Sequence, residues 1–547
     1  MALKWRQLAS ATLAGHMLLL TVCNGKSRLL TGQHVAVSFM LYIVGSFVWT
    51  AFIYPRFISP LRHLPQPTQS HWLLGHRSWT HPTDMGIDGT KWVNEIPHHH
   101  FIRFLDYFNR DSLLVTSAEA IGEILTEKDD LFPRSVQSRY IFSRYVGDGI
   151  AIAEGDEHKA QRRALSLAFS ARHIRDLYPL FWAKSAEAVR AVTKKVAASS
   201  SGRTTIECHS WAVRCALDAM GTAGMGLELG TIQDEDHALV RAYEDLKKFS
   251  WQDALMILLG TALPKRFVAS LPLRRNCVID ASRAQIYAVC RRAVRRKQNA
   301  RDDQESGHVD ICSTIVNSGL FHEEDAIDQL MVMLFASHHA PARSLTGAFY
   351  ALSCAPEKQE RLRDEVRRRL PSIDDSTQIT HADIESMPYL QAVCKEVLRK
   401  YSTGVASREA ACDVTIQGNV IPKGTAVKLA VMSANADPNL WGDDANDFRP
   451  ERWLSDDEGS DRAPGGQDGT TALGGAASKY AYMAFLHGPR NCIAARFAEA
   501  ELACFLATWV GRFKFTLADQ RLADERNLPA RAMETKLEVC TEVVEGW

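Results

Sequence analysis

The stretch FLHGPRNCIA, residues 485–494, decides the fold of this chain. It places Cys492 two residues after Arg490 and just beyond a Gly-Pro turn, and an apolar segment that predicts a helix follows Ala494. Backbone N–H groups and the start of a helix favour negative charge, so a cysteine there can hold its sulfur as a thiolate. Such a thiolate can be the axial ligand of an oxygen-activating heme, and the alternative is a buried free cysteine.

The spacing of Phe485, Gly488, Arg490 and Cys492 resembles the heme-binding loop of the cytochrome P450 family, F-x-x-G-x-R-x-C-x-G. Ala494 departs from that pattern by one methyl group, because it stands where glycine is usual. The resemblance extends from Leu64 to the C-terminus. It implies a mainly α fold with a small β region and a heme b cofactor. It also implies that Cys492 is the axial ligand of the heme iron and that Phe485 and Arg490 bind the cofactor.

Upstream, Glu396 and Arg399 have the E-x-x-R form of the family, in the segment EVLR. Spacing of i and i+3 places both charges on one helix face. A buried carboxylate–guanidinium pair is tolerated only with further hydrogen bonds. The segment FRPERW, residues 448–453, resembles the family's partner segment and predicts that Arg452 completes a structural network with this pair.

Further residues match family positions that bind the heme propionates. The segment 155–163 resembles a helix in which the family has W-x-x-x-R, and here His158 replaces the tryptophan while Arg162 keeps its place. Imidazole and guanidinium can both donate to a carboxylate, and i, i+4 spacing brings them together. Arg408 and Arg490 are the other predicted propionate partners. For each arginine the alternative is a solvent-exposed charge.

Residues 323–353 predict one long helix, because apolar side chains recur with the helical period. The segment 334–342 aligns with the family's oxygen-side pattern A-G-x-[DE]-T-[TS], with His339 in place of the acid and Ala340 in place of the threonine. Pro341 cannot donate to the carbonyl of Ser337, which predicts a bend. His339 is therefore a candidate proton relay, since imidazole titrates near neutral pH. Alternatively, a substrate hydroxyl completes the relay, or His338 and His339 only line a polar pocket.

Composition agrees with one large globular domain. The chain has 547 residues, of which 46% are hydrophobic, and a formal net charge of +0 gives no reason to expect nucleic acid binding. The 12 cysteines include no C-x-x-C pair, so neither a zinc site nor a disulfide framework is predicted. We assign residues 68–547 to the heme-thiolate catalytic domain. Residues 456–478, rich in Gly, Asp and Ser, are predicted to form a disordered insertion.

The N-terminus contains a predicted membrane anchor. Residues 35–54 carry no charge and are long enough to cross a bilayer. Residues 1–34 include a second apolar stretch, Leu8 to Cys23, which gives one membrane pass or two. Residues 55–67 contain four prolines and predict a stiff hinge. The resemblance implies a catalytic domain on the cytosolic face of the endoplasmic reticulum.

The sequence therefore predicts a membrane-anchored heme-thiolate monooxygenase, similar to fungal members that tailor secondary metabolites. The resemblance implies O2 and electrons from an NADPH-cytochrome P450 reductase, docking near Lys159, Arg163 and Arg496. The expected substrate is a small lipophilic molecule, and residues 134–150 are expected to contribute to its pocket. Two alternatives remain: a redox-neutral isomerase or dehydratase on the same fold, motivated by Ala340, and a non-catalytic heme-binding protein.

Overall fold

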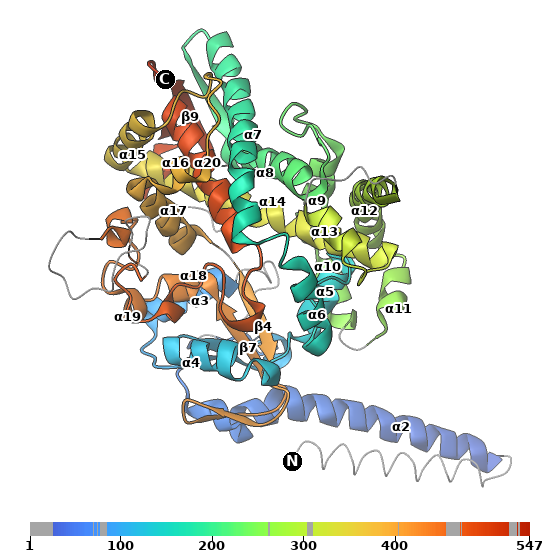
Figure 1. Cartoon of the computed structure of the whole chain (residues 1–547). Coiled ribbons are helices and arrows are strands. Elements are labelled where there is room, and N and C mark those ends of the chain that lie inside the picture. Colours follow the sequence, from blue (N-terminus) through green and yellow to red (C-terminus); the bar gives the residue numbers. More distant parts are fainter. Residues whose placement is uncertain are drawn as a thin grey trace.

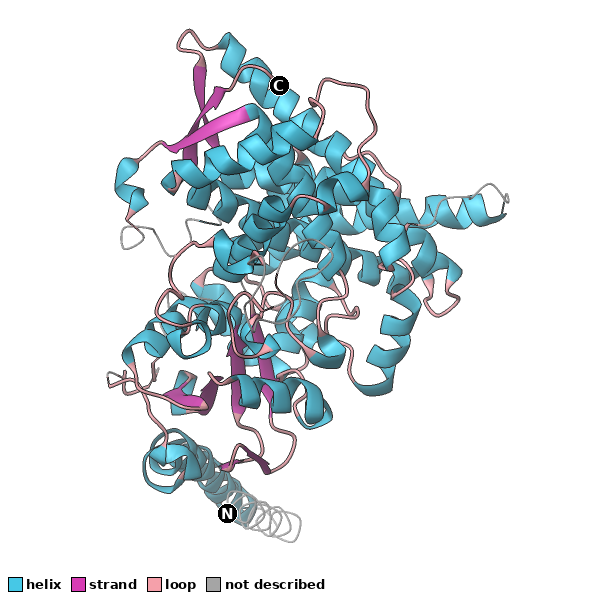
Figure 2. Cartoon of the chain, turned by 60° about the vertical axis from the view of Figure 1, so that its left-hand side comes forward, coloured by secondary structure: helices cyan, strands magenta, loops and turns pink. Residues whose placement is uncertain are grey.

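The computed structural model describes residues 26–68, 70–73, 75–76, 85–260, 263–302, 310–402, 404–455, 471, 473–524, 533 and 537–547. These residues form a mainly helical body with small sheets near opposite ends, and a long N-terminal helix extends from one end (Figures 1 and 2). The mainly α fold with a small β region is therefore confirmed. Leu8 to Cys23 and most of the predicted insertion at 456–478 lie outside the described residues.

Helices make up most of the body. The α-helices are α2 (Lys26–Val48), α3 (Met85–Glu95), α4 (Ala118–Gly122), α5 (Val136–Val146), α6 (Gly155–Leu165), α7 (Ala171–Ala198), α8 (Cys208–Met225), α9 (Ala238–Lys247), α10 (Trp251–Gly260), α11 (Lys265–Ser270), α12 (Arg274–Asp302), α13 (Ile311–Asn317), α14 (Glu323–Cys354), α15 (Pro356–Arg369), α16 (His381–Glu385), α17 (Pro388–Tyr401), α18 (Val431–Asn435), α19 (Pro438–Trp441) and α20 (Ala495–Arg512). Shorter 3-10 or π turns are η1 (Trp49–Ile58), η2 (Pro60–His63), η3 (Tyr107–Asn109), η4 (Glu123–Glu127), η5 (Asp129–Leu131), η6 (Pro450–Trp453), η7 (Lys479–Ala481), η8 (Gly488–Arg490) and η9 (Gln520–Ala523).

The strands form three small sheets. They are β1 (Phe101–Leu105), β2 (Asp111–Val115), β3 (Arg203–Glu207), β4 (Val405–Glu409), β5 (Val414–Ile416), β6 (Asn419–Ile421), β7 (Ala426–Ala430), β8 (Phe513–Leu517) and β9 (Glu538–Val543). The sheet orders are β1-β2-β7-β4, β3-β9-β8 and β5-β6. Strands β5, β6 and β7 follow one another closely, and a turn that contains Gly424 separates β6 from β7.

Helix α14 runs through the middle of the helical body, packed against α8, α17 and α20 (Figure 1). It matches the predicted helix 323–353 to within one residue. Its helical assignment continues without a break through Pro341, so a bend at this proline stays a prediction. Residues Ile327, Leu330, Met331 and Leu334 are buried, as the apolar periodicity predicts.

The N-terminal segment docks on the body through its last turns. Residues Ala36–Ile58 form a helical stretch of 23 residues that is long and apolar enough to cross a membrane. The proline-rich segment that follows makes specific contacts: Leu61 is fully buried, and Arg103 donates to the carbonyl of Pro55 at 2.6 Å. Residues 55–67 therefore pack on the sheet β1-β2-β7-β4 at least in part, where composition alone predicted only a stiff hinge.

Candidate heme site

The loop that carries Cys492 is closed by its own backbone. The N–H of Cys492 donates to the carbonyl of Phe485 at 2.9 Å, and η8 fills the turn between them. Gly488 has φ of 76° and a Cβ at this position would lie 1.8 Å from the carbonyl oxygen of Leu125, so only glycine fits there. Helix α20 begins directly after the loop, at Ala495. Gly488 is therefore needed because the loop passes very close to η4.

Alanine fits at position 494, where the family pattern usually has glycine. Its φ of −97° is ordinary for any L-residue, so the extra methyl group strains nothing. Cys492 is accessible, yet desolvation raises the pKa of its thiol, while the N–H of Ala494 and the charge of Arg162 act in the opposite direction. The thiol therefore opens onto a space enclosed by protein, with donors beside it that favour the thiolate.

Three guanidinium groups are buried together near this loop. Arg134 and Arg408 form a β-bridge, and Arg490 donates to the carbonyl of Ala153 at 2.9 Å and pairs with Glu154. Desolvation, together with the charges of the neighbouring Arg408 and Arg490, lowers the pKa of Arg134 to about 10. Nε and Nη1 of Arg408 and Nε of Arg134 are buried with no hydrogen-bond partner among the described residues.

Buried donors without acceptors are rare, because each unsatisfied group is destabilising by about 1–3 kcal/mol. The carboxylates beside the three guanidiniums are Glu154 and Asp129. The cluster therefore carries surplus positive charge and spare N–H groups, which fits the two propionates of a heme. Arg408 and Arg490 were predicted from the sequence, whereas Arg134 was not, because no motif marks it.

His158 and Arg162 lie on α6, as predicted, but they face different partners. The His158 side chain is buried, and desolvation followed by Arg490 and Arg162 lowers its pKa to about 4, so it is neutral at physiological pH. Arg162 donates to the carbonyl of Asn491 at 2.8 Å and to its side-chain oxygen at 2.5 Å. Arg162 thus fixes the residue next to Cys492, while His158 lies within the field of the arginine cluster.

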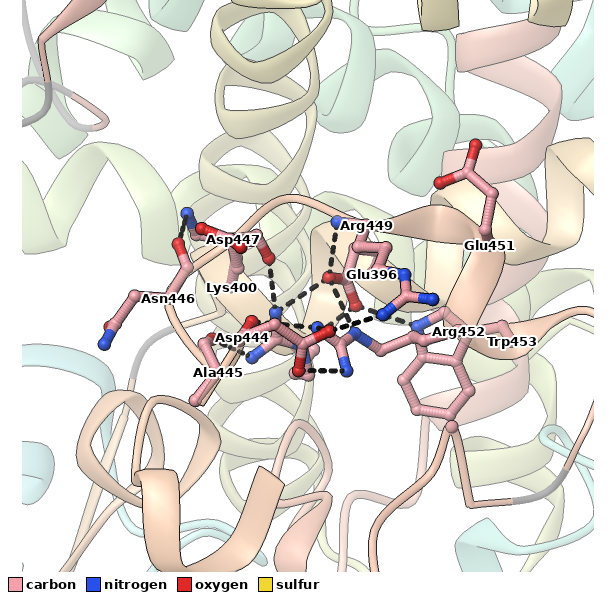
Figure 3. A network of polar contacts seen from close by, with 12 residues as sticks. Glu396, Lys400, Asp444, Ala445, Asn446, Asp447, Arg449, Glu451, Arg452 and Trp453 are labelled. Atoms are coloured by element: carbon pink, nitrogen blue, oxygen red, sulfur yellow. Dashed lines mark hydrogen bonds and ion pairs between the residues drawn. The ribbon is translucent and has the colours of Figure 1, made fainter. Parts of the chain in front are cut away.

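The predicted network of Glu396, Arg399 and Arg452 is present, and Figure 3 shows Glu396 and Arg452 within it. Arg399 donates to both oxygens of Glu396 at 2.8 and 2.7 Å, and Arg452 Nε donates to Oε1 at 3.1 Å. The indole of Trp453 and the backbone N–H of Arg449 complete the shell of donors at 2.9 Å. Desolvation raises the pKa of the Glu396 carboxyl, but the donors outweigh it and the net shift is downward. The glutamate is therefore ionised and fully coordinated.

This network reaches the cysteine loop through Asn435. Arg399 donates to the carbonyls of Asn435 and Ala445 at 2.6 Å each and to that of Asp447 at 2.9 Å. The side-chain oxygen of Asn435 in turn accepts the N–H of Met483 at 2.9 Å, two residues before the heme-loop pattern begins. A chain of buried hydrogen bonds thus connects the E-x-x-R helix α17 to the base of the loop.

The middle of α14 has one exposed side and one buried side. Ala336 and Ala340 are exposed one turn apart, whereas His338 and Ala342 are buried. His339 is half-buried and stacks on Phe335, with ring centroids 6.0 Å apart at 13°. Since i and i+4 share a face, the two alanines mark one exposed side of the helix. His339 lies just beside that side.

Comparison with known proteins identifies this arrangement. A family model described as cytochrome P450 matches residues 65–538. The chain is 39% identical over 496 residues to the cytochrome P450 monooxygenase sphH of Aspergillus fumigatus, covering 89% of this chain and 88% of that protein. It is 35% identical over 544 residues to the cytochrome P450 monooxygenase FUM15 of Gibberella moniliformis, covering 92% and 91%.

The chain belongs to the cytochrome P450 family. It is accordingly an oxidoreductase, a P450 monooxygenase acting on a small substrate, and its cofactor is a heme held by a cysteine thiolate. The N-terminal helical stretch of 23 residues, which is long and apolar enough to cross a membrane, is consistent with a microsomal member of the family.

Proposed function

We propose that Cys492 provides the thiolate ligand of the heme iron. The position of Cys492 supports this proposal most strongly. Cys492 is accessible but enclosed, and it lies beside a buried guanidinium cluster with unsatisfied N–H groups. A heme would satisfy both, because Cys492 would hold its iron and the guanidinium groups would hold its propionates. When bound, it supplies two-electron reduction of O2 and transfer of one oxygen atom to the substrate.

The propionates are held by Arg408, Arg134 and Arg490, with His158 at the edge of the cluster. Phe485 closes the cysteine loop by accepting the N–H of Cys492. Arg162 acts on Cys492 indirectly, because its guanidinium binds the neighbouring Asn491 and so holds the loop in place. Glu396, Arg399 and Arg452 are structural and do no chemistry.

The substrate is lipophilic and enters from the side of the N-terminal helix. A cavity of about 300 Å³ lies between η3, the start of α5, α10 and the strands β4 and β7. Its walls include Phe108, Val136, Phe249, Ile257 and Leu258. Phe108 also packs edge-on against Phe47 of α2, with ring centroids 5.8 Å apart. Residues 135–137 belong to the segment expected to contribute to the pocket, and the cavity would receive a molecule dissolved in the bilayer.

Electrons come from an NADPH-cytochrome P450 reductase. Lys159 and Arg163 are exposed on α6, and Arg496 is exposed at the start of α20 next to the cysteine loop. Positive charge here would steer an acidic partner to the side nearest the sulfur. We also propose that the catalytic domain faces the cytosol at the endoplasmic reticulum and that the enzyme acts in fungal secondary metabolism. The family and the apolar N-terminal helix support this proposal.

His339 relays protons during oxygen reduction. It occupies the place of the family's acid, and Ala340 offers no hydroxyl, so the imidazole is an ionisable group beside the exposed alanines of α14. Replacing His339 by alanine should lower turnover about 10²-fold, the low end for loss of a general acid, without loss of heme. Normal turnover of this variant would leave the substrate or ordered water as the proton carrier.

Product analysis decides the function. The full-length protein, co-expressed with a reductase and supplied with candidate lipophilic substrates, should form product with NADPH and O2 consumed in proportion. Ala340, in place of the family's alcohol, motivates the redox-neutral isomerase or dehydratase. That function requires product to form without NADPH, and such a result would replace the monooxygenase.

A further inference from the structure

A largely buried polar cluster surrounds His338, whose ring centroid lies 6.4 Å from that of His339. It consists of His338 on α14, His209 in the first turn of α8, and Tyr243 and Lys247 one turn apart on α9. The rings of Tyr243 and His338 lie 3.9 Å apart between centroids. His209, His338 and Tyr243 are all buried. Aliphatic side chains would pack such a helix junction at lower free energy, so the polar composition requires a reason.

The tautomers in this cluster follow from the hydrogen bonds. Lys247 Nζ lies 3.0 Å from Nε2 of His209, and an ammonium group only donates, so Nε2 accepts and Nδ1 carries the hydrogen. His338 Nδ1 lies 2.9 Å from the carbonyl of Leu334, which only accepts, so that Nδ1 donates. His338 is therefore tied to its own helix. The Nδ1–H of His209 is therefore a donor that remains available inside the protein.

Two polar atoms of the cluster are orphaned. Nδ1 of His209 and the hydroxyl of Tyr243 are buried with no hydrogen-bond partner in the described part of the chain. Buried polar atoms without protein partners are the usual positions of ordered water. At the other end, the side chain of Lys247 contacts Glu244 at 3.5 Å, and the Glu244 side chain is 45% exposed. The cluster thus spans from solvent to α14.

The charges of the cluster act on one another. Desolvation, together with Lys247, His339 and His338, lowers the pKa of His209 to about 2. Desolvation likewise lowers the pKa of His338 to about 3. Both imidazoles are therefore neutral and serve as fixed hydrogen-bonding groups. Glu207, Glu244 and Arg343 are the other charged groups facing these histidines and Lys247.

We propose that Lys247 and His209 position the His339 imidazole and connect it, through ordered water, to the surface at Glu244. Lys247 fixes the tautomer of His209, whose Nδ1–H then orders the water beside His339. This role rests on the proposed function of His339 as proton relay. It makes Lys247 and His209 positioning residues for proton delivery, on a side of α14 away from the substrate.

The test uses the full-length, heme-loaded protein with its reductase. Lys247→Met removes the charge and the donor, Lys247→Arg restores both, and Lys248→Met is the matched control. Lys248 follows Lys247 directly but pairs with Asp245 at an exposed site. Turnover, peroxide released per NADPH consumed, and the pH profile of turnover are measured for each variant. Hydrogen exchange at C2 of His209, followed by mass spectrometry against pH, reports the titration of this imidazole independently of activity.

We expect Lys247→Met to lower turnover by up to about 10²-fold, the low end for impaired proton transfer, and to raise peroxide release. Loss of the positive charge should also move the pH profile and the exchange profile of His209 to higher pH. Lys247→Arg and Lys248→Met should match the wild type in every measurement. His209→Asn keeps a donor of similar size, so its turnover should lie between those of Lys247→Met and the wild type.

Unchanged turnover and pH profile in Lys247→Met would overturn the proposal, and so would an unchanged exchange profile of His209. Failure of Lys247→Arg to restore the wild-type pH profile would also overturn it. Failure of the proposed function gives a different result, because the wild type would then form no NADPH-dependent product.

Discussion

Replacement of Arg399 by lysine tests the buried network beneath the cysteine loop. Arg399 makes two hydrogen bonds to Glu396 and three to backbone carbonyls, and neither side chain is exposed. Lysine keeps the positive charge but presents its donors from a single point, so it cannot reproduce the planar fork. At least one buried carbonyl, at residue 435, 445 or 447, loses its partner.

The expected loss of stability follows from these contacts. Removal of one partner from a buried pair destabilises by about 3–5 kcal/mol, and each acceptor left unsatisfied by about 1–3 kcal/mol. Because lysine retains the charge, we expect Arg399→Lys to lower the free energy of unfolding by about 2–4 kcal/mol. Urea unfolding of the heme-loaded protein, followed by far-UV circular dichroism, measures this. Arg241→Lys, at an exposed pair with Asp236, is the control and should leave the midpoint unchanged.

The same variant tests the connection through Asn435. Because Asn435 holds the N–H of Met483, disorder around Arg399 should spread to the loop and weaken the reduced carbon-monoxide band at ~450 nm per heme. An unfolding midpoint equal to that of wild type would refute the structural role of the network. A lowered midpoint with a full band would instead show that the network stabilises the fold but does not affect the cysteine loop.

Three further predictions concern the cofactor, pH and the anchor. Arg408→Leu removes two spare donors and should speed transfer of heme to an acceptor apoprotein; an unchanged rate would remove Arg408 from the cradle. The pKa of His158 is lowered to about 4 in the folded protein. At pH values between this pKa and the ordinary pKa of histidine, the unfolded state therefore binds more protons than the folded state. The heme-free protein should therefore lose stability as pH falls through this window, and His158→Phe should flatten the loss in thermal unfolding. Deletion of residues 1–48 should reduce membrane attachment with little effect on stability, whereas deletion of 1–62 should destabilise by about 1.5–3 kcal/mol, since it removes the buried Leu61. Equal stability of both truncations in urea unfolding would contradict the docking.

Local patterns predicted the elements and the network well. The apolar period specified α14 to within one residue, and the i, i+3 spacing placed Glu396 and Arg399 on one face. Arg452 was predicted to join them because the family resemblance supplies a contact that spacing cannot. These features rest on residues close in sequence or on a recognisable segment.

Contacts between distant segments were not predictable. Arg134 joins the cluster through a β-bridge to Arg408, and Lys247 meets His209 because α8 and α9 both pack near α14. No spacing in the sequence marks either pair. Composition likewise predicted a hinge at 55–67, but it could not show that Leu61 is buried or that the Pro55 carbonyl binds Arg103.

The identity of the iron ligand is tested most directly by the reduced carbon-monoxide spectrum of Cys492→Ser. Thiolate ligation gives a band at ~450 nm in the wild type, and the variant should lose this band completely. Cys354→Ser, at an exposed cysteine near the end of α14, is the control and should keep the band. A band at ~450 nm that persists in Cys492→Ser would show that another residue ligates the iron and would contradict the assignment.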